Sequence, residues 1–189
     1  MIRIPKPTSQ SPRVISGSAR GMRLSVADSP GIRPTSLRLR ESVFSILESI
    51  ETNYDSILDL YAGSGALGIE ALSRSNGSAI FVERDRAAVE TIQSNINRLQ
   101  FGNRSSVQHM SVEKWLPSAQ DSFTVVFADP PYYELDLGET LTDKLENCLA
   151  DRAVLVLEHA ADQSVPDSIC NISLYKNRQH GRGAVAIYC

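Results

Sequence analysis

The sequence contains few cysteines, one tryptophan and no long hydrophobic run. Its three cysteines, Cys148, Cys170 and Cys189, have no metal-ligand spacing, and their odd number argues against a disulfide framework. No apolar run approaches the ~20 residues that a bilayer span requires, and residues 1–12 are polar and proline-rich, unlike a secretory signal. These absences predict a cytoplasmic protein with reduced thiols, no bound metal and no membrane association.

The charges are unevenly distributed, although the net charge is only −3. Residues 1–40 hold eight Lys or Arg and one acid, whereas the remainder holds 11 basic and 21 acidic residues. A basic segment on an acidic body is typical of proteins that bind polyanions, and arginine suits phosphate. A solvated extension that binds nothing is the alternative. We divide the chain into an N-terminal arm, residues 1–34, and a main domain, residues 35–189.

A glycine-containing stretch, SILDLYAGSGALGIEAL at residues 56–72, predicts a buried strand, a tight turn and a helix. Gly63, Gly65 and Gly68 fit G-x-G-x-x-G, in which backbone N–H groups at a helix N-terminus face a nucleotide-like ligand. Glu83, 20 residues after Gly63, ends the next apolar run and can accept hydrogen bonds from a ribose. Nicotinamide and S-adenosylmethionine enzymes share this pattern, so it does not decide between them.

Helical and strand periodicities alternate along the rest of the chain. The pattern predicts an α/β fold: a three-layer sandwich with a mostly parallel, seven-stranded sheet ending in an antiparallel pair, plus a small β-hairpin in the arm. The hairpin strands are expected at 13–18 and 22–26. Sheet strands are expected at 57–60, 79–83, 106–110, 124–128, 154–158, 169–175 and 184–188, and helices at 36–50, 66–72, 85–100, 112–116 and 137–149.

The second motif is Asp129-Pro130-Pro131-Tyr132, directly after the predicted strand 124–128. If strands 57–60 and 124–128 are neighbours, their ends face one crevice. The prolines form a stiff rim with carbonyl acceptors. The Asp129 carboxylate and the Pro130 carbonyl can hold the two hydrogens of a nucleobase amine and align its lone pair for attack, and Tyr132 can stack on the base.

The two motifs together resemble a class I S-adenosylmethionine-dependent methyltransferase of the amino-methylating type. The segments RVISG (13–17), DSPGIRPT (28–35), RLRESVF (38–44) and YAGSGALGIEALSR (61–74) are more specifically similar to bacterial 16S ribosomal RNA guanine-N2 methyltransferases. This resemblance spans residues 13–188. It implies a Rossmann-like fold and a metal-free monomer that binds S-adenosyl-L-methionine. The expected substrate is a guanine of 16S rRNA in the small ribosomal subunit or an assembly intermediate.

The resemblance also implies roles for individual residues. The expected catalytic residues are Asp129, Pro130, Pro131 and Tyr132. Ser111 and Val112 stand where the family usually has Asp or Asn followed by Ala beside the adenine. Residues expected to bind the cofactor are Asp59, Tyr61, Ala62, Gly63, Ser64, Gly65, Glu83, Arg84, Ser111, Val112 and Asp129; those expected to bind RNA are Arg13, Arg20, Arg23, Arg33 and Arg38.

Four other functions compete with this interpretation. An adenine-N6 methyltransferase acting on DNA or RNA usually carries a target-reading domain, for which the 57 residues after Tyr132 leave no room. A protein glutamine methyltransferase usually has Asn in place of Asp129. An NAD-dependent oxidoreductase explains the three glycines but leaves the Asp129–Tyr132 motif unused. A non-catalytic RNA-binding module predicts RNA binding without cofactor affinity.

Overall fold

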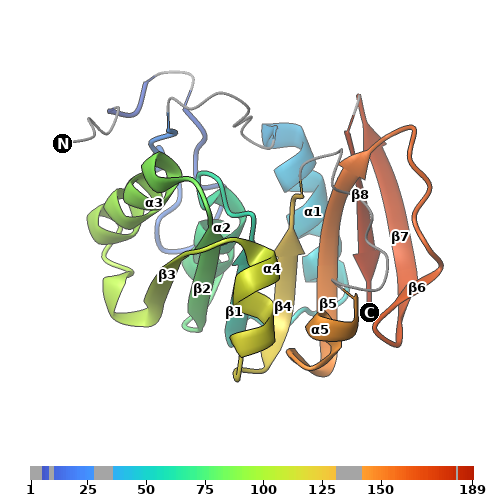
Figure 1. Ribbon diagram of the computed structural model, residues 1–189. Coiled ribbons are helices and arrows are strands. Elements are labelled where there is room, and N and C mark those ends of the chain that lie inside the picture. The colour runs from blue at the N-terminus through green and yellow to red at the C-terminus, as the bar shows by residue number, and fades with distance from the viewer. Residues whose placement is uncertain (1–5, 9–10, 28–35, 131–141, 182) are drawn as a thin grey trace.

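The computed structural model describes residues 6–8, 11–27, 36–130, 142–181 and 183–189. Residues from Leu37 onwards form a mixed sheet with helices on both faces (Figure 1). The helices are α1 (Leu37–Ser49), α2 (Ala66–Arg74), α3 (Arg86–Arg98), η1 (Gly102–Arg104), α4 (Val112–Trp115), η2 (Leu116–Ser118) and α5 (Thr142–Glu146). The strands are β1 (Ser56–Leu60), β2 (Ser78–Glu83), β3 (Ser105–His109), β4 (Phe123–Ala128), β5 (Leu149–Ala160), β6 (Ser168–Ile169), β7 (Ile172–His180) and β8 (Gly183–Tyr188).

The strand order is β3-β2-β1-β4-β5-β8-β7-β6. The strands from β3 to β5 are parallel, whereas β8, β7 and β6 pair antiparallel. The order reverses between β1 and β4, which are neighbours with Leu60 opposite Ala128. Ligands of open α/β sheets bind beyond the strand ends at such a reversal. The two motif-bearing strands are thus neighbours, which is the condition under which both motifs face one crevice.

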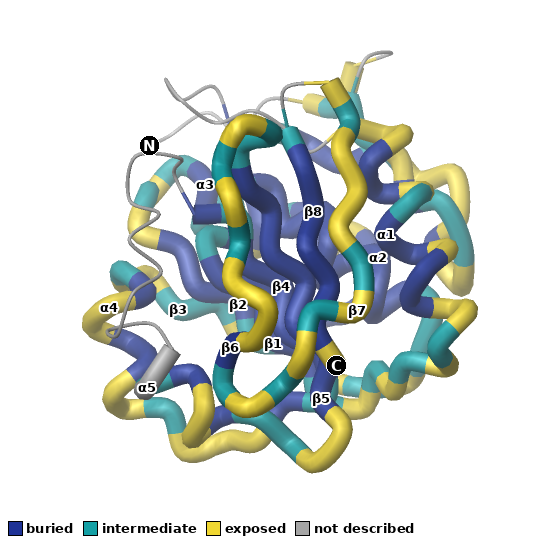
Figure 2. The backbone as a smooth tube through the Cα atoms, turned by 90° about the vertical axis from the view of Figure 1, so that its right-hand side faces the viewer, coloured by how far each residue is buried: buried dark blue, intermediate teal, exposed yellow. Residues whose placement is uncertain are grey.

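Alternating side chains of the central strands enter two separate hydrophobic cores. Ile57, Phe127 and Val156 pack with residues of α1, α2, α3 and the arm, whereas Leu58 and Leu157 pack with residues of α4, η2 and α5. The strands at the centre of the sheet are buried, and β7 is largely exposed at its edge (Figure 2). The three-layer α/β architecture is as predicted.

Within the described residues the sheet has eight strands, not the predicted seven. The predicted strand 169–175 is in fact the end of β6, a turn and the start of β7, which continues to His180. The turn is formed by Cys170 and Asn171, both with positive φ. Two-residue hairpin turns with positive φ normally contain glycine. The sequence has no glycine here, so the pattern did not predict the turn.

The predicted helix 137–149 was also placed wrongly at its C-terminal end. Within the described residues, α5 ends at Glu146 and β5 begins at Leu149. The N–H of Phe123 donates to the Cys148 carbonyl at 2.7 Å, and Leu149 pairs with Phe123 in the sheet. Pairing with β4 thus places the residues from Leu149 onwards in a strand, although their polar pattern did not predict one.

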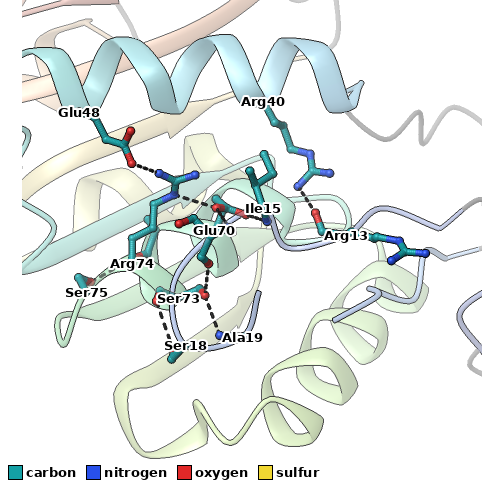
Figure 3. A network of polar contacts seen from close by, with 12 residues as sticks. Arg13, Ile15, Ser18, Ala19, Arg40, Glu48, Glu70, Ser73, Arg74 and Ser75 are labelled. Atoms are coloured by element: carbon teal, nitrogen blue, oxygen red, sulfur yellow. Dashed lines mark hydrogen bonds and ion pairs between the residues drawn. The ribbon is translucent and has the colours of Figure 1, made fainter. Parts of the chain in front are cut away.

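Over its described residues 11–27, the arm forms one isolated antiparallel β-bridge, between Arg13 and Arg23, in place of the predicted two-stranded hairpin. The reason is visible in Figure 3: the backbone between them bonds to α2. Glu70 accepts hydrogen bonds from the N–H groups of Ile15, at 2.6 Å, and Ser16, at 2.9 Å. The Ser16 N–H is therefore unavailable for a longer β-ladder.

Two arginines complete this attachment (Figure 3). Arg74 donates to Glu70 at 2.7 Å and also pairs with Glu48 on α1. Arg40, 1% exposed on α1, donates to the Arg13 carbonyl at 3.0 Å. Glu70 itself is fully buried. Because a buried carboxylate requires charged or N–H partners, the arm and α2 stabilise one another.

Gly17 provides a test of this docking. A Cβ at Gly17 would lie 1.8 Å from the Ser73 carbonyl oxygen, whereas one at Gly21, which has nearly the same φ, would meet nothing within 4 Å. We expect Gly21→Ala to cost about 1–2 kcal/mol, from left-handed strain alone. We expect Gly17→Ala to cost about 1–3 kcal/mol more, from overpacking. Urea unfolding and trypsin cleavage of the arm measure both, and equal losses would contradict the close docking.

Candidate functional site

The glycine loop joins β1 to α2 and runs from Tyr61 to Gly65. Gly63 and Gly65 both have positive φ, 54° and 73°. Gly65 is the N-cap residue of α2 and lacks a side-chain cap. The loop therefore presents bare backbone and the N-terminus of a helix, an arrangement that accommodates a nucleotide-like ligand.

Glu83, at the end of β2, fixes the shape of this loop. One carboxylate oxygen accepts from the Gly63 N–H at 2.8 Å, and the other accepts from the Asp85 N–H at 2.7 Å. Each carboxylate oxygen has a second lone pair. The same side chain can thus hold the loop and accept hydrogen bonds from two ligand hydroxyls.

Asp59 lies beneath the loop rather than along it. Its side chain, 3% exposed, accepts from the Gly68 N–H at 2.9 Å. A Cβ at Gly68 would lie 2.5 Å from Phe81 and 2.9 Å from Asp59, so this glycine is required for close packing of α2 on the sheet. Burial raises the pKa of Asp59 to about 8, with a further contribution from Glu83, although the Gly68 hydrogen bond opposes the shift.

Asp59 predicts a pH dependence of stability in the cofactor-free protein. Because its folded pKa of about 8 exceeds the unfolded value, its contribution is full below the unfolded pKa, near 4. That contribution is lost as the pH rises through about 8. We expect the free energy of unfolding to fall from pH 5 to pH 9, and to fall less in Asp59→Asn. Urea unfolding midpoints across this pH range measure the change in stability. Equal pH dependence in the wild type and in Asp59→Asn would show that Asp59 is not responsible.

A second group of predicted cofactor residues meets at the ends of β2 and β3. Ser111 is the N-cap residue of α4, and Val112 is buried. The Tyr61 hydroxyl donates to Glu113 at 3.1 Å. Burial raises the pKa of Glu113, but hydrogen bonds from its own backbone, Ser111 and Tyr61, and the charge of Arg84, lower it overall. Glu113, which sequence reasoning missed, thus connects three predicted residues.

Asp129 and Pro130 follow β4 directly, at the edge of the sheet where the glycine loop follows the neighbouring parallel strand β1. Pro130 is buried and Asp129 half-buried. Burial, then the charges of Glu158 and Asp59, raise the pKa of Asp129 well above its usual range. Pro131 and Tyr132 lie outside the described residues.

Glu158 is a further acid at this edge. It lies near the C-terminal end of β5 and is 9% exposed. The sequence pattern predicts Glu158 only as the last residue of a strand. The sequence does contain a feature that could have predicted a role at the site, because Glu158 follows an apolar run just as Glu83 and Asp129 do.

Four of the arginines predicted to bind RNA lie in described segments. Arg13, Arg20 and Arg38 are exposed, and Arg23 is half-buried with a hydrogen bond to the Thr8 carbonyl at 3.0 Å. Arg33 lies outside the described residues.

Asn95 on α3 joins the arm to the glycine loop. This fully buried side chain accepts from the Ser25 N–H at 2.9 Å and donates to the Ser25 carbonyl at 3.0 Å. It also donates to the Ser64 carbonyl, at 3.4 Å. Ser64 was predicted to bind the cofactor, so the arm and the loop share one hydrogen-bond partner. An isolated Asn inside a helical pattern gave no signal of this role.

Two further properties hold for the part of the chain that is described. No cluster of three or more His, Cys, Asp or Glu side chains has metal-binding geometry there. No helix in the same segments is both long and apolar enough to cross a bilayer.

Comparison with known proteins places the chain in a family. Residues 12–189 match the family model described as Conserved hypothetical protein 95. The ribosomal RNA small subunit methyltransferase D of Escherichia coli K12 is 37% identical over 177 residues, which cover 93% of this chain and 88% of that protein. A solved structure of a hypothetical protein from Thermus thermophilus is 33% identical, with a TM-score of 0.77 over 93% of this chain and 97% of that one.

A more distant structure confirms the predicted fold class. The precorrin-6y C5,15-methyltransferase of Geobacter metallireducens is 15% identical, with a TM-score of 0.63 over 87% of this chain and 93% of that chain. At this identity the likeness concerns the fold alone. The family match and the 37% identity carry the assignment: the chain belongs to the Conserved hypothetical protein 95 family, together with the ribosomal RNA small subunit methyltransferases D.

Proposed function

We propose that the protein is an S-adenosyl-L-methionine-dependent methyltransferase that methylates the exocyclic N2 amine of a guanine in 16S rRNA. The observation that carries this proposal is the adjacency of the glycine loop and Asp129-Pro130, at the C-terminal ends of the neighbouring strands β1 and β4. A nucleotide-like ligand in the loop and an amine held by Asp129 would lie in the same crevice. The relatives' small-subunit rRNA substrate supports the choice of acceptor.

The residues around the loop fit the cofactor. The Glu83 carboxylate would accept from the ribose hydroxyls, and Tyr61 to Gly65 would surround the methionine part. Ser111, Val112 and Arg84 would line the adenine, with Ser111 in place of the longer side chain usual in the family. When bound, S-adenosyl-L-methionine supplies an electrophilic methyl group on its sulfonium.

Asp129 and Pro130 would orient the acceptor amine. Their carboxylate and carbonyl oxygens accept the two N2 hydrogens, so the nitrogen lone pair points along the line of attack. The carboxylate also stabilises the positive charge that develops on the nitrogen. Tyr132 is proposed to stack on the base. This arrangement uses Asp129 as the main source of catalytic electrostatics and requires no metal.

The test uses small ribosomal subunits from a strain that lacks this gene, incubated with the purified protein and labelled S-adenosyl-L-methionine. Nucleoside analysis should show labelled N2-methylguanosine, and digestion of the rRNA with mapping of the label identifies the guanine. Label on adenine or on protein would keep the cofactor and overturn the acceptor. Absence of both label and cofactor binding would favour the nicotinamide alternative.

We further propose that the arm, residues 1–34, contacts the rRNA and that the protein acts on the subunit or an assembly intermediate as a monomer. The attachment of the arm through Glu70 holds Arg13 near the body of the domain, and Arg20 and Arg38 are exposed on the arm and on α1. Arg23 and Arg33 complete the proposed set.

Replacing Arg13, Arg20 and Arg38 together with Gln should weaken binding to small subunits and reduce its salt dependence. Three lost phosphate contacts would lower the slope of log K against log salt by about 2. Filter binding across about one decade of salt, from roughly 50 to 500 mM, measures the slope. Arg152→Gln is the control, because this exposed arginine lies near the start of β5, at the end of the strand opposite Glu158. An unchanged slope in the triple variant would remove these arginines from the RNA interface.

A further inference from the structure

Three acidic residues lie at or near the C-terminal ends of three neighbouring strands, β1, β4 and β5, on one face of the sheet. Ile57, Phe127 and Val156 pack in the core on the α2 side. Because side chains alternate along a strand, Asp59, Asp129 and Glu158 lie on that same face. The hydrogen bond from Gly68 of α2 to Asp59 agrees with this placement.

The register places two of these acids next to one another. Ala128 of β4 pairs with Leu157 of β5, so Asp129 and Glu158 are the next residues along adjacent strands. Neighbouring strands are about 4.8 Å apart. The charge of Glu158 acts directly on Asp129, and Glu158 is 9% exposed. Two carboxylates therefore share the rim of the proposed catalytic crevice.

We propose that Glu158 determines the specificity for guanine, by accepting a hydrogen bond from the guanine N1–H while Asp129 holds the adjacent N2 amine. This inference rests on the proposed function and names the group that reads the base.

The donor pattern of guanine matches this pair of acceptors. Its Watson–Crick edge presents N1–H and N2–H₂ side by side, so both groups facing the carboxylates are donors. Adenine presents an unprotonated N1 at the same place, which would face the Glu158 carboxylate with no hydrogen between them. A site built to hydrogen-bond a substrate N–H rejects an analogue that lacks it by as much as about 10⁴–10⁵-fold.

In the free protein the charge of Glu158 disfavours ionisation of Asp129 and so raises its pKa, because like charges near each other in a half-buried site repel. The two guanine donors would offset this repulsion when the base enters. Binding of the correct base is thus coupled to relief of an electrostatic cost, whereas a base with an acceptor at N1 leaves that cost in place.

The test compares guanine with 2-aminopurine at the methylated position. 2-Aminopurine keeps the N2 amine but lacks the N1–H and the O6 carbonyl, so the change in discrimination caused by Glu158→Gln isolates the contribution of N1. Small subunits reassembled from 16S rRNA carrying either base at the mapped position serve as substrates. For the unchanged protein we expect kcat/KM to be at least about 10³-fold lower on 2-aminopurine. For Glu158→Gln, whose amide can donate to an unprotonated N1, we expect this ratio to fall by at least about tenfold.

The outcomes separate this inference from the proposed function. The unchanged protein alone can overturn the inference. If its kcat/KM on 2-aminopurine is within tenfold of that on guanine, the enzyme does not recognise the N1–H. If Glu158→Gln binds S-adenosylhomocysteine normally but keeps the full discrimination, Glu158 is not the reader. In both cases methylation of guanine upholds the proposed function, which fails only if no guanine is methylated.

Discussion

Asp129→Ala should lower turnover on small ribosomal subunits by about three orders of magnitude. The substitution removes the acceptor that aligns the N2 amine and the charge that stabilises its developing positive charge, and these effects are each worth several kcal/mol. The affinity for S-adenosyl-L-methionine should stay within a few-fold, because the backbone of the glycine loop and Glu83 are unchanged. Single-turnover methylation and calorimetric cofactor binding measure the two quantities separately.

Two further variants make the Asp129 result interpretable. Asp129→Asn keeps one acceptor oxygen without the charge, so its turnover should lie between those of the wild type and the alanine variant. Asp121→Ala removes an exposed acid that precedes β4 at the other end of the strand and should leave turnover unchanged. Survival of more than a tenth of the activity in Asp129→Ala would refute the proposed mechanism.

Glu83→Ala should weaken cofactor binding by about 10²–10³-fold. The variant loses the proposed hydrogen bonds to the ribose hydroxyls, and hydrogen bonds to a charged group are worth about 1.5–3 kcal/mol each. It also loses the bonds that Glu83 makes with the N–H groups of Gly63 and Asp85, which fix the loop. Titration calorimetry with S-adenosyl-L-methionine or S-adenosylhomocysteine gives the affinity directly.

Glu90→Ala is the matched control for this prediction. Glu90 is an acid on α3 whose side chain pairs with Arg86 on the same helix, and exposed pairs of this kind contribute little. Its cofactor affinity should equal that of the unchanged protein. A Glu83→Ala variant that is folded and binds the cofactor within tenfold of normal would show that Glu83 holds the loop without touching the ligand.

Much of the site could be predicted because its signals are local. Strand, glycine turn and helix follow one another within residues 56–74, and Glu83 and Asp129 each end an apolar run. Ser36 and Asp85 cap the helices that follow them, as expected from their side-chain oxygens. Such features depend on neighbours in sequence, so the pattern is sufficient to predict them.

Other features were predicted wrongly because they depend on residues that are distant in the sequence. The arm was expected to form a two-stranded hairpin, but its pairing stops at the Arg13–Arg23 bridge, and Glu70, 54 residues from Ser16, accepts the Ser16 N–H that a longer hairpin would use. The start of β5 is polar and was read as part of a helix, yet it pairs with β4. No local pattern encodes either contact, because the competing partner is specified elsewhere in the chain.

The sequence alone determined that this chain places a nucleotide-binding loop and an Asp-Pro-Pro-Tyr motif after two buried strands. Only the tertiary structure decided that β5 lies beside β4, so that Glu158 adjoins Asp129, and that Asn95 joins the arm to the glycine loop. The physical reason is that strand order and register bring together residues far apart in sequence, whereas hydrophobic periodicity records only which face of each strand is buried.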